Sequence, residues 1–200
     1  MTLTSSHIWE GINGIAQVSM AIAVGTGVFI ANKQLKSWRL EHQSKKKADV
    51  AEKLLSNAMD AKDALGSVRS ALEGVPQDVE DRQAYIVKLK WERMMGYAEV
   101  FERLRASQVQ FRALVGDMDV NSAVEDILEV RHEVSVALQM LATPVAGGRQ
   151  TNEGFAFEEE MRSKIYAMGS DKYDKLAPRI RGAIETLETK LLPVIRMEGN

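Results

Sequence analysis

Residues 11–32 read GINGIAQVSMAIAVGTGVFIAN and contain no formally charged side chain. A helix of about 20 mainly apolar residues can cross the roughly 30 Å hydrocarbon core of a bilayer, so the length of this stretch fits a span. Residues 18–31 are its most apolar part, whereas Asn13 and Gln17 dilute the first turns. We therefore predict a transmembrane helix at residues 11–32, preceded by a short extracytoplasmic N-terminus at residues 1–10.

The residues on either side of this stretch predict its orientation. No Lys or Arg precedes it, whereas a basic juxtamembrane segment at residues 33–47 follows it and contains six cations: Lys33, Lys36, Arg39, Lys45, Lys46 and Lys47. The positive-inside rule then places the C-terminal side in the cytoplasm and makes the chain a single-pass protein of the inner (cytoplasmic) membrane. The cations would also contact anionic lipids of the inner leaflet.

Two tryptophans support the same interpretation. Trp9 and Trp38 bracket the uncharged stretch, 29 residues apart. A helix of that length measures about 43 Å, close to the distance between the two interfacial zones of a bilayer. Tryptophan is enriched at these interfaces. Both residues are therefore expected at the membrane surface.

Other interpretations of the stretch remain open. A cleaved signal peptide would carry a basic start, where this chain has His7 and Glu10. The stretch could instead be a buried, apolar helix of a soluble helical-bundle subunit. Small residues recur every four positions, at Ser19, Ala23, Gly27 and Ala31. Such a stripe allows membrane helices to pack closely, which would suit an oligomerising effector that forms pores or perturbs the bilayer.

The remainder of the chain, residues 48–200, predicts a helical cytoplasmic domain. All four prolines lie beyond residue 75, and no sustained two-residue alternation of apolar and polar residues indicates strands. We expect helices over 48–72, over about 78–115 with Asp78 as its cap, and from Asn121 or Ser122 with Glu125 completing a capping box. A loop at 143–154 precedes helices over 155–168 and from residue 170 or 171. The predicted fold is all-α, a transmembrane helix followed by an extended bundle of about five helices.

Two of these helices carry apolar residues at alternating spacings of four and three, as in coiled coils. The expected bundle seam contains Leu54, Leu65, Val68, Phe101, Leu104 and Phe111. Narrow seams of this kind favour close packing of one helix against another. In the last two helices Phe157 and Met161, and then Leu176 and Ile180, are expected to face inward.

The sequence lacks the patterns typical of catalytic, metal-binding and nucleic-acid-binding sites. The absence of cysteine removes thiolate metal sites and cysteine nucleophiles, and a net charge of −2 argues against general nucleic-acid binding. Glu129 and His132 have the spacing used in di-iron bundles, but those sites need two such pairs and two further glutamates. No known catalytic motif is present. We predict no catalytic, cofactor-binding or metal-binding residues, and no small-molecule substrate is evident.

The N-terminal fifth of the chain, with Trp9, Glu10, Ile12, Ile15 and Ala16 before an apolar run that ends near Gln34-Leu35, resembles small single-pass membrane proteins of bacteria and prophages. These have one N-terminal membrane helix, a helical cytoplasmic tail and no known activity. The resemblance therefore implies topology alone. The predicted anchor, the two seams and the absence of a catalytic motif suggest a membrane-tethered, non-enzymatic scaffold, regulator or subunit that docks a partner protein or itself.

Overall fold

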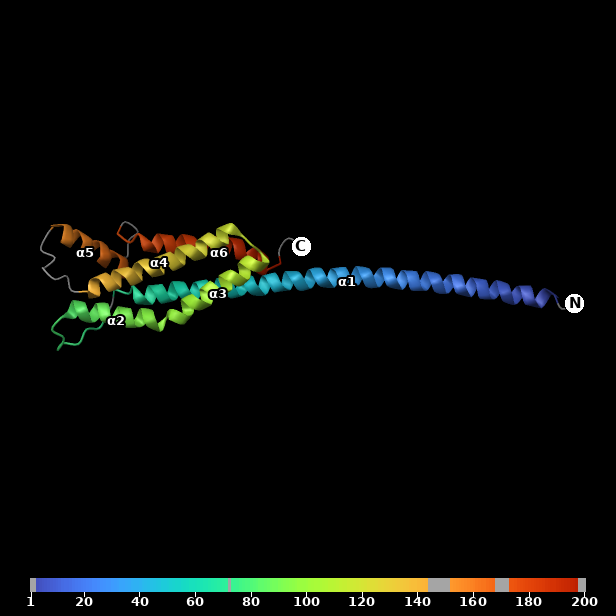
Figure 1. The fold of residues 1–200 in the computed structure, drawn as a ribbon, viewed down its shortest axis with the longest axis horizontal. Coiled ribbons are helices and arrows are strands. Elements are labelled where there is room, and N and C mark those ends of the chain that lie inside the picture. Colours follow the sequence, from blue (N-terminus) through green and yellow to red (C-terminus); the bar gives the residue numbers. More distant parts are fainter. Residues whose placement is uncertain (1–2, 72, 144–151, 168–172, 198–200) are drawn as a thin grey trace. The chain divides into compact units, whose positions relative to one another are not determined.

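The computed structural model spans residues 1–200 and describes all of them except 1–2, 72, 144–151, 168–172 and 198–200; side chains are also not described at 3–19, 21–23 and 152–153. The described residues form helices and no strands (Figure 1). The helices are α1 (Leu3–Val68), α2 (Arg82–Gly96), α3 (Ala98–Leu114), α4 (Met118–Ala142), α5 (Asn152–Ile165) and α6 (Leu176–Ile195). The chain is therefore all-α.

The chain divides into two compact units, residues 1–46 and 47–200, with α1 contributing to both. In the part of the chain that the structure describes, no helix combines the length and apolar character needed to cross a bilayer. This finding does not support the transmembrane helix predicted at residues 11–32. The side chains of residues 11–19 and 21–23 lie outside the described set, and the remainder is shorter than the roughly 20 residues that a span needs.

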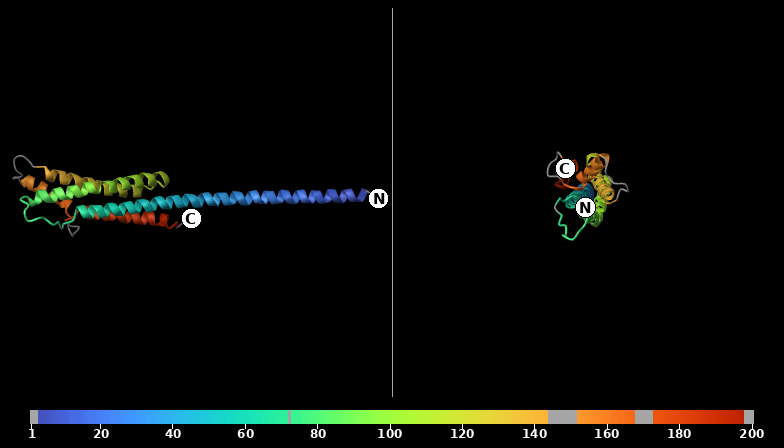
Figure 2. Two further views of the ribbon diagram at one scale, coloured as in Figure 1. Left: turned by 90° about the horizontal axis from the view of Figure 1, so that it is seen from below. Right: turned by 90° about the vertical axis from the view of Figure 1, so that its left-hand side faces the viewer.

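The second unit is a helical bundle in which α4 contacts α2, α3, α5 and α6 (Figures 1 and 2). From α1, the bundle receives a row of buried residues with alternating spacings of three and four: Ala51, Leu54, Ala58, Ala61, Leu65 and Val68. Three of the six are alanines, and small side chains allow neighbouring backbones to approach closely. The central helix α4 is buried on several sides, at Val120, Val124, Ile127, Val130, Val134 and Leu138.

The helix predicted over residues 78–115 is two helices, α2 and α3, which meet at Tyr97. The Tyr97 N–H donates to the carbonyls of Arg93 and Met94, both at 3.2 Å, so the last turn of α2 is tightened. Gly96, a poor helix former, lies directly before this break. The N-terminal cap is Asp81 rather than Asp78, because the Asp81 carboxylate accepts the Ala84 N–H at 2.9 Å.

Three further helix starts differ from expectation. Helix α5 begins at Asn152, so residues 152–154 of the loop predicted at 143–154 belong to the helix. Helix α4 begins at Met118 because Asp117 accepts the N–H groups of Asp119 (2.8 Å) and Val120 (3.1 Å). Glu125 is therefore inside the helix and completes no capping box. Helix α6 begins at Leu176, whereas the predicted starts at residues 170 and 171 lie outside the described residues.

The end of α1 and the inward face of α5 also differ from the predictions made from the sequence. Helix α1 ends at Val68, four residues before the predicted end at residue 72. Phe157 was expected to face inward, but its side chain is exposed. Met161 and Ile165 on the same helix are buried, so α5 contacts the bundle mainly through its C-terminal half.

Two glycines provide a matched test of this backbone. Gly66 lies within α1, and no atom lies within 4 Å of the position that a Cβ would occupy there, whereas Gly116 ends α3 with a φ of +76°. Replacing Gly66 with Ala should stabilise the bundle by about 0.5 kcal/mol, because Ala has the higher helix propensity. Gly116→Ala should destabilise it by about 1 kcal/mol, because L-residues disfavour a positive φ. Urea unfolding followed by circular dichroism measures both, and equal effects would contradict this backbone assignment.

Candidate functional site

The apolar and the basic side chains that are predicted to contact the membrane are exposed on the described part of α1. Seven large apolar side chains of residues 24–40 are exposed on α1, namely Val24, Val28, Phe29, Ile30, Leu35, Trp38 and Leu40. All six basic side chains of residues 33–47 are exposed as well. The Trp38 and His42 rings stack, with centroids 5.6 Å apart and planes at 14°. The side chain of Trp9 lies outside the described residues.

The small-residue stripe is only partly described. Gly27 has open space around it, and Ala31 is exposed. The side chains of Ser19 and Ala23 lie outside the described residues. The structure therefore gives no contact through this stripe.

The predicted bundle seam lies inside the second unit. Leu54, Leu65, Val68 and Leu104 are inaccessible to solvent, and Phe101 and Phe111 are nearly so. They belong to one core cluster. These side chains are therefore occupied by the chain's own helices. Replacing Leu65 or Phe101 with polar residues would test the folding of the bundle and not its contact with a partner.

The second unit contains a buried polar junction where several helix ends meet. The Arg69 guanidinium donates to the carbonyls of Lys164 (2.8 Å) and Tyr166 (3.0 Å) at the end of α5, and to the Asp174 carboxylate (2.7 Å). Asp174 in turn accepts the N–H groups of Leu176 (3.0 Å) and Ala177 at the start of α6. Arg69 and Asp174 are both buried, and their ion pair joins three helix ends.

A second buried cation completes this junction. Lys90 of α2 is inaccessible to solvent, and its Nζ donates to the carbonyls of Val68 (2.9 Å) and Ser70 (2.6 Å) at the end of α1. Its Nζ also lies 3.4 Å from the Glu73 carboxylate and 4.8 Å from the centre of the Tyr166 ring. A cation at a helix C-terminus satisfies free carbonyls and complements the helix dipole.

Ionisation in the junction follows from these contacts. Burial alone would raise the pKa of Asp174, but the Arg69 hydrogen bond and the Ala177 N–H outweigh it and lower that pKa. Burial likewise opposes ionisation of Glu73, whose pKa is lowered by Arg93 and Lys90. Burial lowers the pKa of Lys90, and Glu73 partly opposes that shift. Each buried charge has a partner, which indicates a structural role for the junction.

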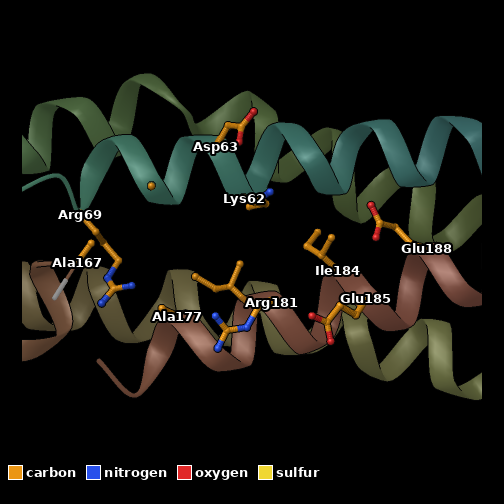
Figure 3. A pocket seen from close by; sticks show the side chains of 11 residues that line it. Lys62, Asp63, Arg69, Ala167, Ala177, Arg181, Ile184, Glu185 and Glu188 are labelled. Atoms are coloured by element: carbon orange, nitrogen blue, oxygen red, sulfur yellow. The ribbon is translucent and has the colours of Figure 1, made fainter. Parts of the chain in front are cut away.

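A groove of about 570 Å³ lies beside the junction, between α1 and α6. Gly66, Ala177, Ile180 and Ile184 contribute its apolar surface. Figure 3 shows Ile184 from α6 in the space between the two helices. The charged residues at its edges carry both signs, so the groove has no charge preference that would identify a ligand.

The acidic residues around His132 form ion pairs with basic residues of neighbouring helices. Glu129 lies 3.1 Å from Arg179, and Glu133 pairs with Arg179 and with Lys164 at 3.5 Å. His132 is exposed. Within the described part of the chain, no three potential ligands are grouped for a metal ion. These carboxylates connect α4 to α5 and α6.

The junction was not identified from the sequence. One signal was present, because Lys90 lies on the apolar face of α2 between Val87 and Met94. A lysine at such a position suggests a buried cation whose partners lie on other elements. Arg69 and Asp174 are 105 residues apart, and no local pattern pairs them.

Lys90 and Lys88 provide a matched pair on α2. Lys90→Met should lower the free energy of unfolding by about 3 kcal/mol, because it leaves buried carbonyls and Glu73 without their cation. Lys88→Met should change it by less than about 0.5 kcal/mol, since Lys88 is exposed and its pair with Glu92 spans 3.9 Å. Urea unfolding measures both, and a small Lys90 effect would show that the junction is dispensable.

Acid should weaken the junction. Because the folded-state pKa values of Asp174 and Glu73 are lowered, their contribution is complete above the ordinary values of 3.8 and 4.5 and is lost as pH falls through the folded-state values. Thermal unfolding should show a melting temperature that declines below about pH 4.5. The Asp174→Asn variant should have a lower melting temperature at neutral pH, and its melting temperature should decline less in acid. An identical acid decline in both proteins would exclude Asp174 as a contributor.

Comparisons with known proteins give no assignment. No protein-family model matches the sequence, no curated protein matches it, and no solved structure matches its fold.

Proposed function

We propose that this chain is a membrane-tethered, non-enzymatic helical protein that acts as a scaffold, regulator or subunit, with its N-terminal helix in a bilayer and its bundle available to a protein partner. The observation that carries the proposal is the exposure of the apolar side chains on α1 within residues 24–30. Val24, Val28 and Phe29 are between 61 and 71% exposed, and Ile30 is 49% exposed.

These apolar side chains surround the helix. With about 100° of rotation per residue, Val28 lies about 40° from Val24, Phe29 about 140° and Ile30 about 240°. A single partner helix covers one side of such a helix, whereas lipid covers all sides. A helix that is apolar all round is typical of a membrane span or of a deeply buried core helix. The exposure of these residues favours the span.

The charges around the stretch support the same proposal and its orientation. Residues 11–32 contain no charged side chain, and no Lys or Arg precedes them. Lys33, Lys36 and Arg39 follow and are exposed. The positive-inside rule then gives an extracytoplasmic N-terminus and a cytoplasmic bundle.

The second unit supports a non-enzymatic role. Its buried ionisable side chains, Arg69, Lys90 and Asp174, bond to helix ends and to one another. In this arrangement the charges stabilise the bundle. The apolar seams are likewise occupied within the bundle, so a partner would contact its outer surface.

Two matched double variants test the tether. Val24→Arg/Val28→Arg places two cations in the uncharged stretch, and each Arg near the centre of a span costs about 2.5–3.5 kcal/mol. Val109→Arg/Leu114→Arg makes the same kind of change at exposed positions of α3. After cell fractionation, we expect wild type and the α3 variant in the membrane pellet, resistant to alkaline carbonate, and the α1 variant in the supernatant.

Two outcomes of the fractionation would contradict the proposed tether. Wild-type protein in the supernatant would overturn the tether. Retention of the Val24→Arg/Val28→Arg variant in the carbonate-resistant pellet would show that residues 24–30 are not the attachment.

A further inference from the structure

Resting on the proposed tether, we propose that Lys33, Lys36 and Arg39 form a binding site for the headgroups of anionic phospholipids. These three residues follow the uncharged stretch at intervals of three along α1. All three side chains are exposed, and the part of the chain that the structure describes offers them no ion pair. The other three cations of the basic segment, Lys45, Lys46 and Lys47, do not belong to the proposed site.

Distance along the helix separates Lys33, Lys36 and Arg39 from the later cations of the basic segment. At 1.5 Å per residue, Lys36 and Arg39 lie about 4.5 and 9 Å beyond Lys33, and each headgroup zone is about 5–7 Å thick. Long Lys and Arg side chains extend toward the interface, so all three reach it. Lys45 and Lys46 lie about 18–20 Å beyond Lys33, further than the Debye length of roughly 8–10 Å at ordinary ionic strength.

The rotation of the helix places the three cations on one side. At about 100° per residue, Lys33, Lys36 and Arg39 fall within an arc of about 120°. Trp38 lies outside that arc, at the depth of the interface, where its ring is favoured. Glu41 is the sole acidic residue in the basic segment; it also lies outside the arc, one turn before Lys45.

The residue types suit the lipid phosphate. A lysine ammonium supplies a point charge, and the Arg39 guanidinium can donate two parallel hydrogen bonds to one phosphate. Each cation near an anionic membrane surface contributes roughly 1 kcal/mol, which corresponds to about a fivefold preference over a neutral surface. The site therefore distinguishes lipids by net charge, and not by the phosphate group that zwitterionic lipids also carry.

The test uses the full chain in lipid nanodiscs of phosphatidylcholine alone or with added phosphatidylglycerol. Each lysine is acetylated by a water-soluble reagent, and its rate is read by mass spectrometry. We expect Lys33 and Lys36 to react about fivefold more slowly with phosphatidylglycerol present, and high salt to remove the difference. Lys45 and Lys46 are internal references whose rates should stay the same. Equal slowing of all four lysines would overturn the site.

Two triple variants test the residues themselves. Lys33→Gln/Lys36→Gln/Arg39→Gln removes the site, and Lys45→Gln/Lys46→Gln/Lys47→Gln removes the same charge further along the segment. Protein purified from mixed-lipid membranes should be enriched in phosphatidylglycerol for wild type and the second variant, but not for the first. Loss of enrichment in both variants would show that total charge, and not this site, selects the lipid.

Failure of the site and failure of the tether give different results. If the chain does not co-elute with either nanodisc, the tether is wrong. If it co-elutes with both and Lys33 and Lys36 react equally in both, the tether stands and the lipid site is wrong. Soluble glycerophosphoglycerol, added to phosphatidylcholine discs, should give no protection; protection by it would replace the lipid surface with a free headgroup as the ligand.

Discussion

The bundle depends on how the helix ends buried inside it are satisfied. Carbonyl groups at the ends of α1 and α5 have no partner within their own helices, and their burial would be costly if they were left unpaired. Lys90 supplies the donor for the end of α1, and Arg69 supplies it for the end of α5. Asp174 then balances Arg69 and caps α6. The three side chains together fix how four helices meet.

The part of α1 in the second unit contributes to the core without large aromatic side chains. The row from Ala51 to Val68 is half alanine, so it fixes a close approach and contributes little volume. Specificity then comes from the polar junction, because a buried charge tolerates few arrangements of its partners. The groove between α1 and α6 adjoins this junction, where Gly66 and Ala177 leave space between the helices.

The first unit presents the opposite situation. Its apolar side chains at Val24, Val28 and Phe29 have no cover from the described chain, and its cations follow directly. Water is a poor solvent for a helix that is apolar on all sides. A bilayer satisfies such a helix and its cations at once, which is why the tether and the lipid site at Lys33 are proposed together.

The sequence by itself determined the helical class, because apolar residues at three- and four-residue spacing place Leu54, Leu65 and Phe101 on inward faces whatever the partner helix is. The absence of charge in residues 11–32 and the cations that follow them were likewise determined by the sequence alone. Only the tertiary structure decided the break at Tyr97 and the burial of Lys90. The reason is physical: several nearby acids could cap each helix start, and the partners of a buried charge come from segments that no local pattern connects.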